Sequence, residues 1–218
     1  YLHQYALKQL SHILLKFYVP TCCRTCKEWR KVYGCSMGTL DKNKFQKIPN
    51  FLDLKEKNLL SIYCKNVVRK YLHDIKEIET YMVPGECGHY NDPLMESLLE
   101  NKVKMIENIT QLKLYPTYSF WRMYTYGATL QPHKDRGECE ITVSVHIDGD
   151  SKWPLIIDNT ELFTEAGDAI IYYGTELKHE RNIFEGDFQT QVFLHFVKQN
   201  GPFANRKFDG RLSLGQMR

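Results

Sequence analysis

The feature that most constrains the fold of this sequence is a change of composition at Tyr115. Before this residue, apolar positions recur at helical spacing. After it, short runs rich in β-branched and aromatic residues are separated by Gly, Asp and Asn. Such runs are typical of β-strands joined by turns. Helical segments followed by five or more short strands predict an α+β protein whose sheet closes into a barrel or jelly roll. The five runs are YSFWRMYTYG (118–127), CEITVSVHID (139–148), WPLIID (153–158), DAIIYYG (168–174) and QTQVFLHFV (189–197).

Three segments before the strand-rich part are expected to be helical, because their apolar residues share one face. They are residues 1–17, most of residues 48–76 after a short extended entry, and a helix capped by Asp92 with Pro93 at its first position. The stretch PGECGHYNDP (84–93) is predicted to be a loop because of its glycines and prolines. The apolar positions assigned to the two later helix faces are Leu59, Ile62, Val67 and Tyr71, then Leu94, Leu98, Val103 and Ile106.

Length and composition favour a globular protein. With 218 residues, 43% of them hydrophobic and 25% charged, the chain can bury a full core as one domain with an appendage. No apolar run approaches the roughly 20 residues of a membrane span, so no membrane partner is expected. The seven cysteines, an odd number, favour a reducing compartment over a disulfide framework. We therefore expect a cytoplasmic protein, with a removed targeting segment as the open alternative because the sequence starts at Tyr1 and not at Met.

The basic residues are concentrated in the first 50 positions. These hold nine Lys/Arg and two acidic residues, a net charge of +7, which leaves −4 for the remainder of a chain whose total is +3. We divide the chain into a basic, cysteine-rich helical extension (1–48), a main domain (49–200) with its β core at about 111–198, and a C-terminal tail (201–218). A basic region of this kind can contact nucleic acid or another acidic partner.

Four of the cysteines lie in this extension, and two of them have C-x2-C spacing. A structural zinc site usually combines two such pairs, or one pair with two histidines. Zinc binding and ordinary buried or free thiols therefore both remain open. The four residues are Cys22, Cys23, Cys26 and Cys35.

The segment QPHKDRGECE (131–140) contains the triplet His133-Lys134-Asp135. Two histidines and one carboxylate on one face of a metal are typical of non-haem iron(II) oxygenases, which keep the other positions open. Alternate residues at a strand edge share a face, so the triplet can supply two ligands and a neighbouring strand the third. His179, just past the end of the strand expected in EAGDAIIYYGTELKHER, meets this demand.

A rival ligand set is available in His146, Asp148 and His195. His146 lies inside an alternating run of β-branched residues and His195 inside VFLHFV, so each is more simply explained as a sheet residue on the polar or inner face. We therefore favour the first set, in which both histidines lie near the ends of predicted strands.

The segments FWRMYTYGATLQPHKDRGECEITVSVHIDGDSKWPLIID and FTEAGDAIIYYGTELKHERNIFEGDFQTQVFLHFV resemble the double-stranded β-helix core of the iron(II)/2-oxoglutarate dioxygenases, in particular the prolyl-hydroxylase-like branch. The resemblance covers about residues 90–200. It implies a jelly-roll, cupin-like core with flanking N-terminal helices. It also implies His133, Asp135 and His179 as metal ligands and catalytic residues, with Fe(II), 2-oxoglutarate and O2 as cofactor and co-substrates and ascorbate as an optional addition.

The resemblance also indicates where 2-oxoglutarate would bind, and here the sequence departs from the family. Tyr124 stands nine residues before the first histidine, where prolyl hydroxylases place a tyrosine that contacts 2-oxoglutarate. The Lys or Arg that usually follows the second histidine by about ten residues is replaced by Gln189, with Gln191 close behind. A neutral amide supplies no charge, so we expect Arg181 to bind the distal carboxylate instead, with Arg122 as the second choice.

The function implied is that of an iron(II)- and 2-oxoglutarate-dependent oxygenase. It would hydroxylate a peptide side chain or a small amino-acid-like substrate and release succinate and CO2. Two alternatives stay open. The missing basic residue at position 189 favours a catalytically inactive jelly-roll module that binds a metal or ligand, and the basic extension favours a nucleic-acid-binding protein.

Overall fold

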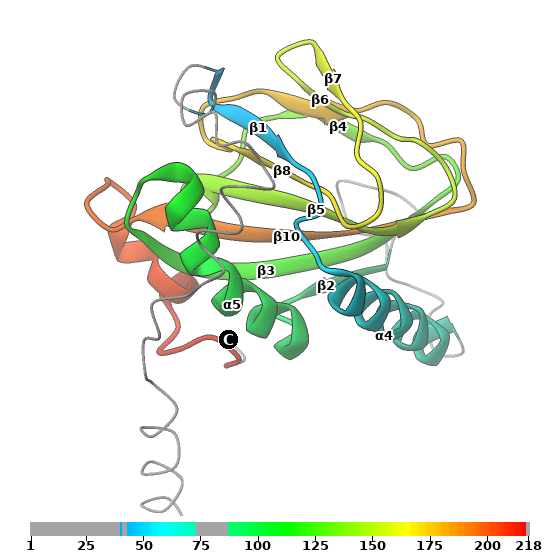
Figure 1. Ribbon diagram of the computed structural model, residues 1–218, viewed down its shortest axis with the longest axis horizontal. Helices are drawn as coiled ribbons and strands as arrows, with labels where there is room; N and C mark the ends of the chain where they lie inside the picture. The colour runs from blue at the N-terminus through cyan, green and yellow to red at the C-terminus, as the bar shows by residue number, and fades with distance from the viewer. Residues whose placement is uncertain (1–39, 41–42, 73–86, 217–218) are drawn as a thin grey trace, which may run out of the picture. The chain divides into compact units, whose positions relative to one another are not determined.

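Two antiparallel β-sheets packed face to face form the centre of the protein (Figure 1). The structure, a computed structural model, describes Leu40 and residues 43–72 and 87–216. The predicted α+β fold with a jelly-roll core is confirmed. The larger sheet has the order β1 (Phe45–Ile48), β8 (Ala169–Tyr172), β5 (Ile141–Gly149), β10 (Phe188–Lys198), β3 (Leu114–Thr125) and β2 (Cys87–Tyr90), and the smaller one β4 (Leu130–His133), β9 (His179–Arg181), β6 (Leu155–Ile157) and β7 (Thr160–Leu162).

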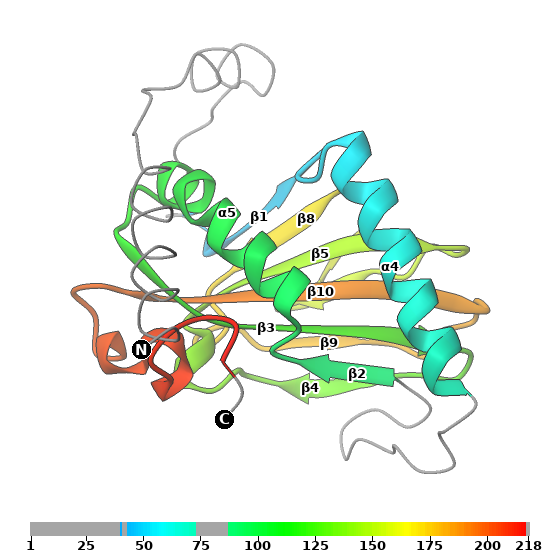
Figure 2. The same ribbon diagram turned by 90° about the horizontal axis from the view of Figure 1, so that it is seen from below.

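Two helices, α4 (Leu54–Leu72) and α5 (Pro93–Thr110), lie across the face of the large sheet that points away from the small sheet (Figure 2). The predicted start of α5 is confirmed, because the Asp92 side chain accepts hydrogen bonds from the backbone N–H groups of Leu94 and Met95. The cap thus fixes where the chain turns from β2 into the helix.

The buried face of α4 differs from the prediction. Leu59 and Ile62 are 58% and 59% exposed, whereas Leu60 and Cys64 are buried. Leu60 and Cys64 are four residues apart and share one face, which packs on the large sheet. The neighbouring Ser61 donates a hydrogen bond to Asp148 of β5, and this contact fixes the rotation of the helix about its axis.

The stretch predicted as a loop at 84–93 contains β2, which pairs with β3 from Cys87↔Met123 to Tyr90↔Phe120. Gly88 lies inside this strand, which has a partner on one side only and is the last strand of its sheet. A short edge strand with a glycine gives little sequence signal, because it has few side chains to alternate.

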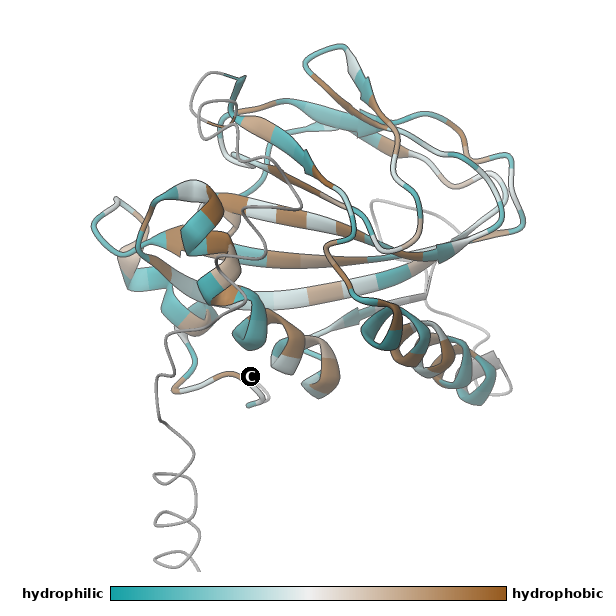
Figure 3. Ribbon diagram, viewed as in Figure 1, coloured by the Kyte–Doolittle hydropathy of each residue, from teal (hydrophilic) through white to brown (hydrophobic). Residues whose placement is uncertain are grey.

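The inner face of the large sheet is unusually polar. In β5, Ile141, Val143, Val145 and Ile147 belong to the apolar core, and β5 contacts α4. The residues between them, Thr142, Ser144 and His146, point toward the small sheet and are also buried. Figure 3 shows the resulting alternation of apolar and polar segments along the central strands. Buried polar groups at this density need partners, so the space between the sheets is where a site is expected.

Segments on both sides of the expected main domain contribute to this fold. β1 pairs with β8, and the 3-10 segment η2 (Ala204–Gly210) contacts β3. The Arg211 guanidinium forms a buried ion pair with Glu96 of α5, at 2.6 Å. The domain boundaries assigned from the sequence stay predictions. The four clustered cysteines and most of the basic extension lie outside the described residues. No helix in the described ranges is both long and apolar enough to cross a bilayer.

Candidate metal centre and co-substrate pocket

The candidate metal centre lies where the chain twice crosses between the sheets. The first crossing leaves β4 after His133 and enters the large sheet at β5; the second leaves β8 and enters the small sheet at His179 in β9. The two crossings are joined by a hydrogen bond of 2.8 Å from the Asp135 N–H to the Gly174 carbonyl. This contact brings together residues that are far apart in the sequence.

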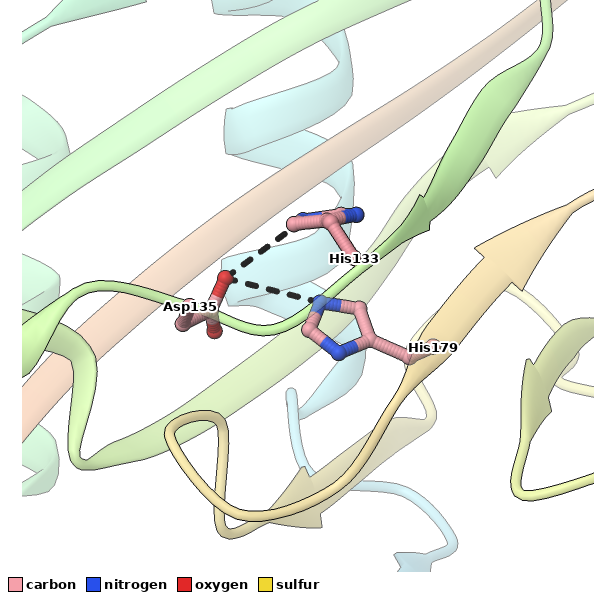
Figure 4. A group of neighbouring side chains, drawn as sticks. All are labelled: His133, Asp135 and His179. Carbon is pink, nitrogen blue, oxygen red and sulfur yellow. Dashed lines mark ion pairs between the residues drawn. The ribbon is translucent and has the colours of Figure 1, made fainter.

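The structure brings together His133, Asp135 and His179, the three residues expected to bind the metal (Figure 4). The Nε2 atoms of His133 and His179 lie 3.6 and 3.5 Å from Asp135 Oδ1. The two histidines are partners in the register of β4 and β9, with ring centroids 4.3 Å apart. One nitrogen from each ring and one oxygen therefore lie within 4.8 Å of one another. Three such donors are the set that non-haem iron(II) sites use.

Both imidazoles are oriented by their backbone. His133 Nδ1 is 2.8 Å from the Gln131 carbonyl, and His179 Nδ1 is 3.1 Å from the Leu177 carbonyl. A carbonyl only accepts, so Nδ1 carries a proton in each ring. In the metal-free centre a protonated Nε2 can donate to Asp135, and loss of that proton frees the Nε2 lone pair for a metal. The hydrogen bond to Asp135 raises the pKa of His133. Burial raises the pKa of Asp135, but hydrogen bonds from both histidines outweigh it and hold that pKa well below its usual range. The centre thus offers one carboxylate and two imidazoles.

The second oxygen of Asp135 is held on the opposite side. Thr142 Oγ1 donates to Oδ2 at 2.8 Å and lies 3.1 Å from His195 Nδ1. Burial lowers the pKa of His195 to about 4, so this ring is neutral at pH 7. Gly174 covers the same oxygen, because a Cβ at this position would lie 2.2 Å from Oδ2. Only a glycine permits so close an approach.

The rival set is not brought together in the part of the chain that the structure describes. Asp148 turns toward α4, where Lys65 Nζ lies 2.6 Å from its carboxylate. His146 and His195 are buried on the inner face of the large sheet, the position that the alternation of their strands predicted. The ring of His146 contacts the Thr164 carbonyl at 3.1 Å.

A different grouping, Asp135 with Cys139 and His195, also satisfies the distance criterion for a metal site. Burial raises the pKa of Cys139 to about 12, so its thiol is protonated at pH 7 and makes a poor ligand. Its Sγ is 3.1 Å from the Tyr118 hydroxyl. We therefore interpret this grouping as a hydrogen-bonded support behind Asp135.

A cluster of buried polar side chains lies beside the candidate centre. Arg181 is 2% exposed and follows His179 by two residues on β9. Its Nη1 donates to the Trp153 carbonyl at 2.6 Å, while no carboxylate of the described residues lies within ion-pair distance. Burial lowers the pKa of this guanidinium, an effect that the nearby Tyr124 and Tyr172 oppose. A buried cation without a carboxylate is costly unless an anion joins it.

Glutamine and histidine side chains from the large sheet complete this polar cluster. Gln189 and Gln191 are 0% and 1% exposed, and they pair with Tyr124 and Arg122 in the register of β10 and β3. Within the described residues, several side-chain atoms of this cluster are buried without a hydrogen-bond partner in the protein. They are Arg181 Nε, Gln189 Oε1 and Nε2, Gln191 Nε2 and His146 Nε2. A polar ligand or bound water between the sheets would supply the partners that such groups need.

The two remaining predicted residues of the pocket belong to β3. Tyr124 is fully buried, with its ring 4.8 Å from that of Trp153 in an edge-on arrangement. The Arg122 guanidinium lies over the rings of Phe120 and Tyr124, at 4.6 and 5.4 Å from their centroids. The Arg181 guanidinium also lies over an aromatic ring, at 4.8 Å from the Trp153 centroid. The two candidate anchors for a carboxylate differ in burial, since Arg181 is 2% exposed and Arg122 is only partly buried.

No family model and no curated protein matches the chain. Solved structures do match. A prolyl-4-hydroxylase from Pseudomonas putida is 16% identical with a TM-score of 0.59, over 74% of this chain and 96% of that chain. HygX from Streptomyces hygroscopicus, solved with nickel and 2-oxoglutarate bound, is 10% identical with a TM-score of 0.53, over 74% and 85%. A prolyl hydroxylase from Trichoplax adhaerens, solved with a hypoxia inducible factor peptide fragment, is 11% identical with a TM-score of 0.58, over 81% and 94%. The chain has the fold of the iron(II)/2-oxoglutarate oxygenases.

Two residues of this oxygenase fold were missed by the sequence analysis. Thr142 and Gly174 both contact Asp135, yet neither belongs to a recognisable motif. The only signal for Thr142 is a polar residue at an inward position of an apolar strand. For Gly174 it is a glycine at the end of a buried strand, which ordinarily indicates only a turn.

Proposed function

We propose that this protein is an iron(II)- and 2-oxoglutarate-dependent oxygenase that hydroxylates a peptide side chain or a small amino-acid-like substrate. The observation that carries the proposal is the pairing of two sites on β9. His179 joins His133 and Asp135 in a metal-ligand geometry, and Arg181, two residues on, is a buried cation without a carboxylate partner among the described residues. A metal next to an anion-binding pocket is what a chelating 2-oxo acid requires.

The metal would be held by His133 Nε2, His179 Nε2 and Asp135 Oδ1, the three atoms that face one another. Two imidazoles and one carboxylate would hold iron(II) from one side and would leave other positions free for the co-substrate and O2. Bound iron(II) would supply the oxidation: O2 converts 2-oxoglutarate to succinate and CO2, and one oxygen atom enters a substrate C–H bond. The protein's own part is to keep both imidazoles aligned through their Nδ1 hydrogen bonds.

Arg181 would bind the distal carboxylate of 2-oxoglutarate. Residues two apart on a strand are roughly 6.6 Å apart and point the same way, so a five-carbon dicarboxylate can extend from the metal toward this guanidinium. Arg181 Nε, Gln189 Nε2 and Gln191 Nε2 are buried donors that can satisfy the carboxylate oxygens. In this proposal Gln189 complements the charge that Arg181 supplies, and Tyr124 packs beside the bound chain.

Aromatic side chains would keep water out of this pocket. Trp153 and Phe184 are 5% and 1% exposed and form one apolar cluster with Tyr124. A dry pocket strengthens the attraction between Arg181 and a bound carboxylate, because charges interact more strongly where water is excluded. The peptide found in the Trichoplax structure supports a peptide substrate. Ascorbate, a nucleic-acid or acidic partner and a cytoplasmic location stay predictions from the sequence.

The test is an anaerobic titration followed by turnover. Iron(II) and then 2-oxoglutarate are added to the full chain, and the metal-to-ligand charge-transfer band is recorded. Air is then admitted and succinate is quantified. We expect a band that depends on both additions, and succinate in excess of the protein. A band without succinate would favour the inactive binding module, and the absence of iron binding would contradict the proposal.

A further inference from the structure

The two carboxylate oxygens of Asp135 have different surroundings. Oδ1 faces Nε2 of His133 and of His179, at 3.6 and 3.5 Å. Oδ2 faces the large sheet, where Thr142 Oγ1 donates to it at 2.8 Å. The backbone on the third side is close enough that a Cβ at Gly174 would overlap Oδ2. Oδ2 is thus held by Thr142 and by the close approach of Gly174, and Oδ1 is the oxygen that faces the two histidines.

The direction of each hydrogen bond behind Asp135 follows from the number of protons available. Thr142 has a single hydroxyl proton, and its nearer acceptor is Asp135 Oδ2 at 2.8 Å, against 3.4 Å for the Cys139 carbonyl, so the proton points to Oδ2. Thr142 Oγ1 can then only accept from His195 Nδ1, which lies 3.1 Å away. His195 must therefore carry its proton on Nδ1. Its ring is held against that of Tyr118, with centroids 4.5 Å apart.

We propose that Thr142 is a positioning residue of the metal centre, which restricts Asp135 to binding through Oδ1 alone, and that His195 fixes the direction of the Thr142 hydroxyl. The inference rests on the proposed iron site and goes beyond it. An aspartate free to turn could offer both oxygens to a metal and occupy a position that the co-substrate needs. Thr142 and His195 prevent this from the large sheet, while the two histidine ligands come from the small one.

The decisive experiment compares Thr142→Val with Thr142→Ser. Valine keeps the shape of the side chain and removes the hydroxyl, whereas serine keeps the hydroxyl. Outer-sphere partners of metal ligands typically contribute 10- to 100-fold in metal affinity, so Thr142→Val should bind iron(II) weaker by about that factor. Thr142→Ser should bind like the wild type. His195→Phe keeps the ring against Tyr118 and should show a smaller loss.

Two spectroscopic measurements separate positioning from a general loss of structure. Magnetic circular dichroism of the iron(II)–2-oxoglutarate complex should change in Thr142→Val and return to the wild-type form in Thr142→Ser. In 15N-histidine-labelled wild-type protein, NMR should find His195 protonated at Nδ1, whether or not the valine variant folds.

The outcomes are distinguishable from those for the proposed function. If the wild type binds no iron(II), the proposed oxygenase itself is wrong. If the wild type binds iron(II) and Thr142→Val matches it in affinity and spectrum, only the positioning role is overturned. A wild-type His195 protonated at Nε2 also overturns it, because Thr142 would then have to donate to His195 and not to Asp135.

Discussion

His179 and Arg181 share one face of β9, and each is only 2% exposed. A three-residue strand therefore carries both the buried metal donor and the buried cation of the candidate site. Because alternate residues of a strand point the same way, the distance between the two functional groups is fixed by the backbone. In the proposed function, Arg181 would supply the charge that a neutral Gln189 does not.

Removing any one of the three proposed ligands should abolish tight iron(II) binding. His133→Ala, Asp135→Ala and His179→Ala each leave two protein donors, too few for the facial arrangement. Anaerobic iron(II) titration of each variant gives the affinity. His89→Gln is the matched control, because His89 stacks on Trp121 and is not one of the grouped ligands. Undiminished binding by His133→Ala would show that the choice of ligands is wrong.

Arg181→Met should separate co-substrate binding from stability. Loss of a charged hydrogen-bonding partner should weaken 2-oxoglutarate binding by roughly 1.5–3 kcal/mol, while iron(II) affinity is retained. Without ligand, the variant should be at least as stable as the wild type, because replacing a buried charge by an apolar residue is often neutral or stabilising. Calorimetric titration and thermal unfolding measure the two effects. If Arg181→Met binds 2-oxoglutarate as well as the wild type does and Arg122→Gln binds it more weakly, Arg122 and not Arg181 binds the distal carboxylate.

Gly174→Ala should damage the metal centre specifically. The new Cβ would lie 2.2 Å from Asp135 Oδ2 and 2.5 Å from the Cys139 carbonyl, so Asp135 must move. We expect iron(II) affinity to fall at least as far as in Thr142→Val, with a lower melting temperature. Gly201→Ala is the control, because its new Cβ would also be crowded, at 2.9 Å from Lys198 Cβ, but no ligand residue is among its contacts. If Gly174→Ala binds iron(II) normally, the backbone between β8 and β9 can shift to make room for the new Cβ, and the prediction is wrong.

Asp168 should make the fold sensitive to acid. Burial raises the pKa of this carboxyl, but hydrogen bonds with Lys47 and with two backbone N–H groups outweigh it, and the pKa is lowered. A lowered folded-state pKa adds stability above the unfolded value of about 3.9, and this stability is lost as the pH falls through the folded value.

Asp168→Asn should therefore be less stable at pH 7 by about 1–2 kcal/mol, the value of charged hydrogen bonds after partial replacement by an amide. The difference from the wild type should shrink below about pH 4. Urea unfolding at several pH values measures it, with the exposed Asp187→Asn as control. A difference that does not change with pH would rule out the carboxylate as its cause.

Arg211→Ala should destabilise the protein strongly. The side chains of Arg211 and Glu96 are 3% and 2% exposed and form two hydrogen bonds, at 2.6 and 3.1 Å. Removing one partner of a buried pair leaves the other charge unpaired, at a cost of about 3–5 kcal/mol. Arg206→Ala serves as the control, because it removes an ion pair with Glu138 in which the arginine side chain is itself half exposed. If Arg211→Ala and Arg206→Ala unfold at the same urea concentration, the buried ion pair between Arg211 and Glu96 adds little to the free energy of unfolding.

The sequence was most informative where chemistry and local spacing coincide. The triplet at 133–135 and His179 could be singled out as candidate ligands because metal binding needs particular residue types at strand ends. Asp92 and Pro93 predicted the start of α5 for a similar reason, since a cap is a local interaction. Both features can be read from the local sequence without knowledge of the tertiary contacts.

What could not be predicted depends on contacts between distant segments. The rotation of α4 is fixed by Asp148, which lies 87 residues after Ser61. Gly174 needs its small size only because Asp135 packs against it, and Thr142 is distinguished from other strand threonines only by the carboxylate that it meets. β2 was not predicted because an edge strand of four residues is too short to show an alternation of apolar and polar side chains.

The joining of the two crossings at Asp135 and Gly174 has a consequence for folding. Two of the proposed ligands are on strands of the small sheet, and the third is braced against the large one. An ion bound to all three would cross-link the layers of the sandwich, much as a disulfide joins the two sheets of other β-sandwiches. The metal-free protein should therefore allow the small sheet to separate more readily, with amide hydrogen exchange in β4 and β9 slowed by metal while that in α5 is unchanged.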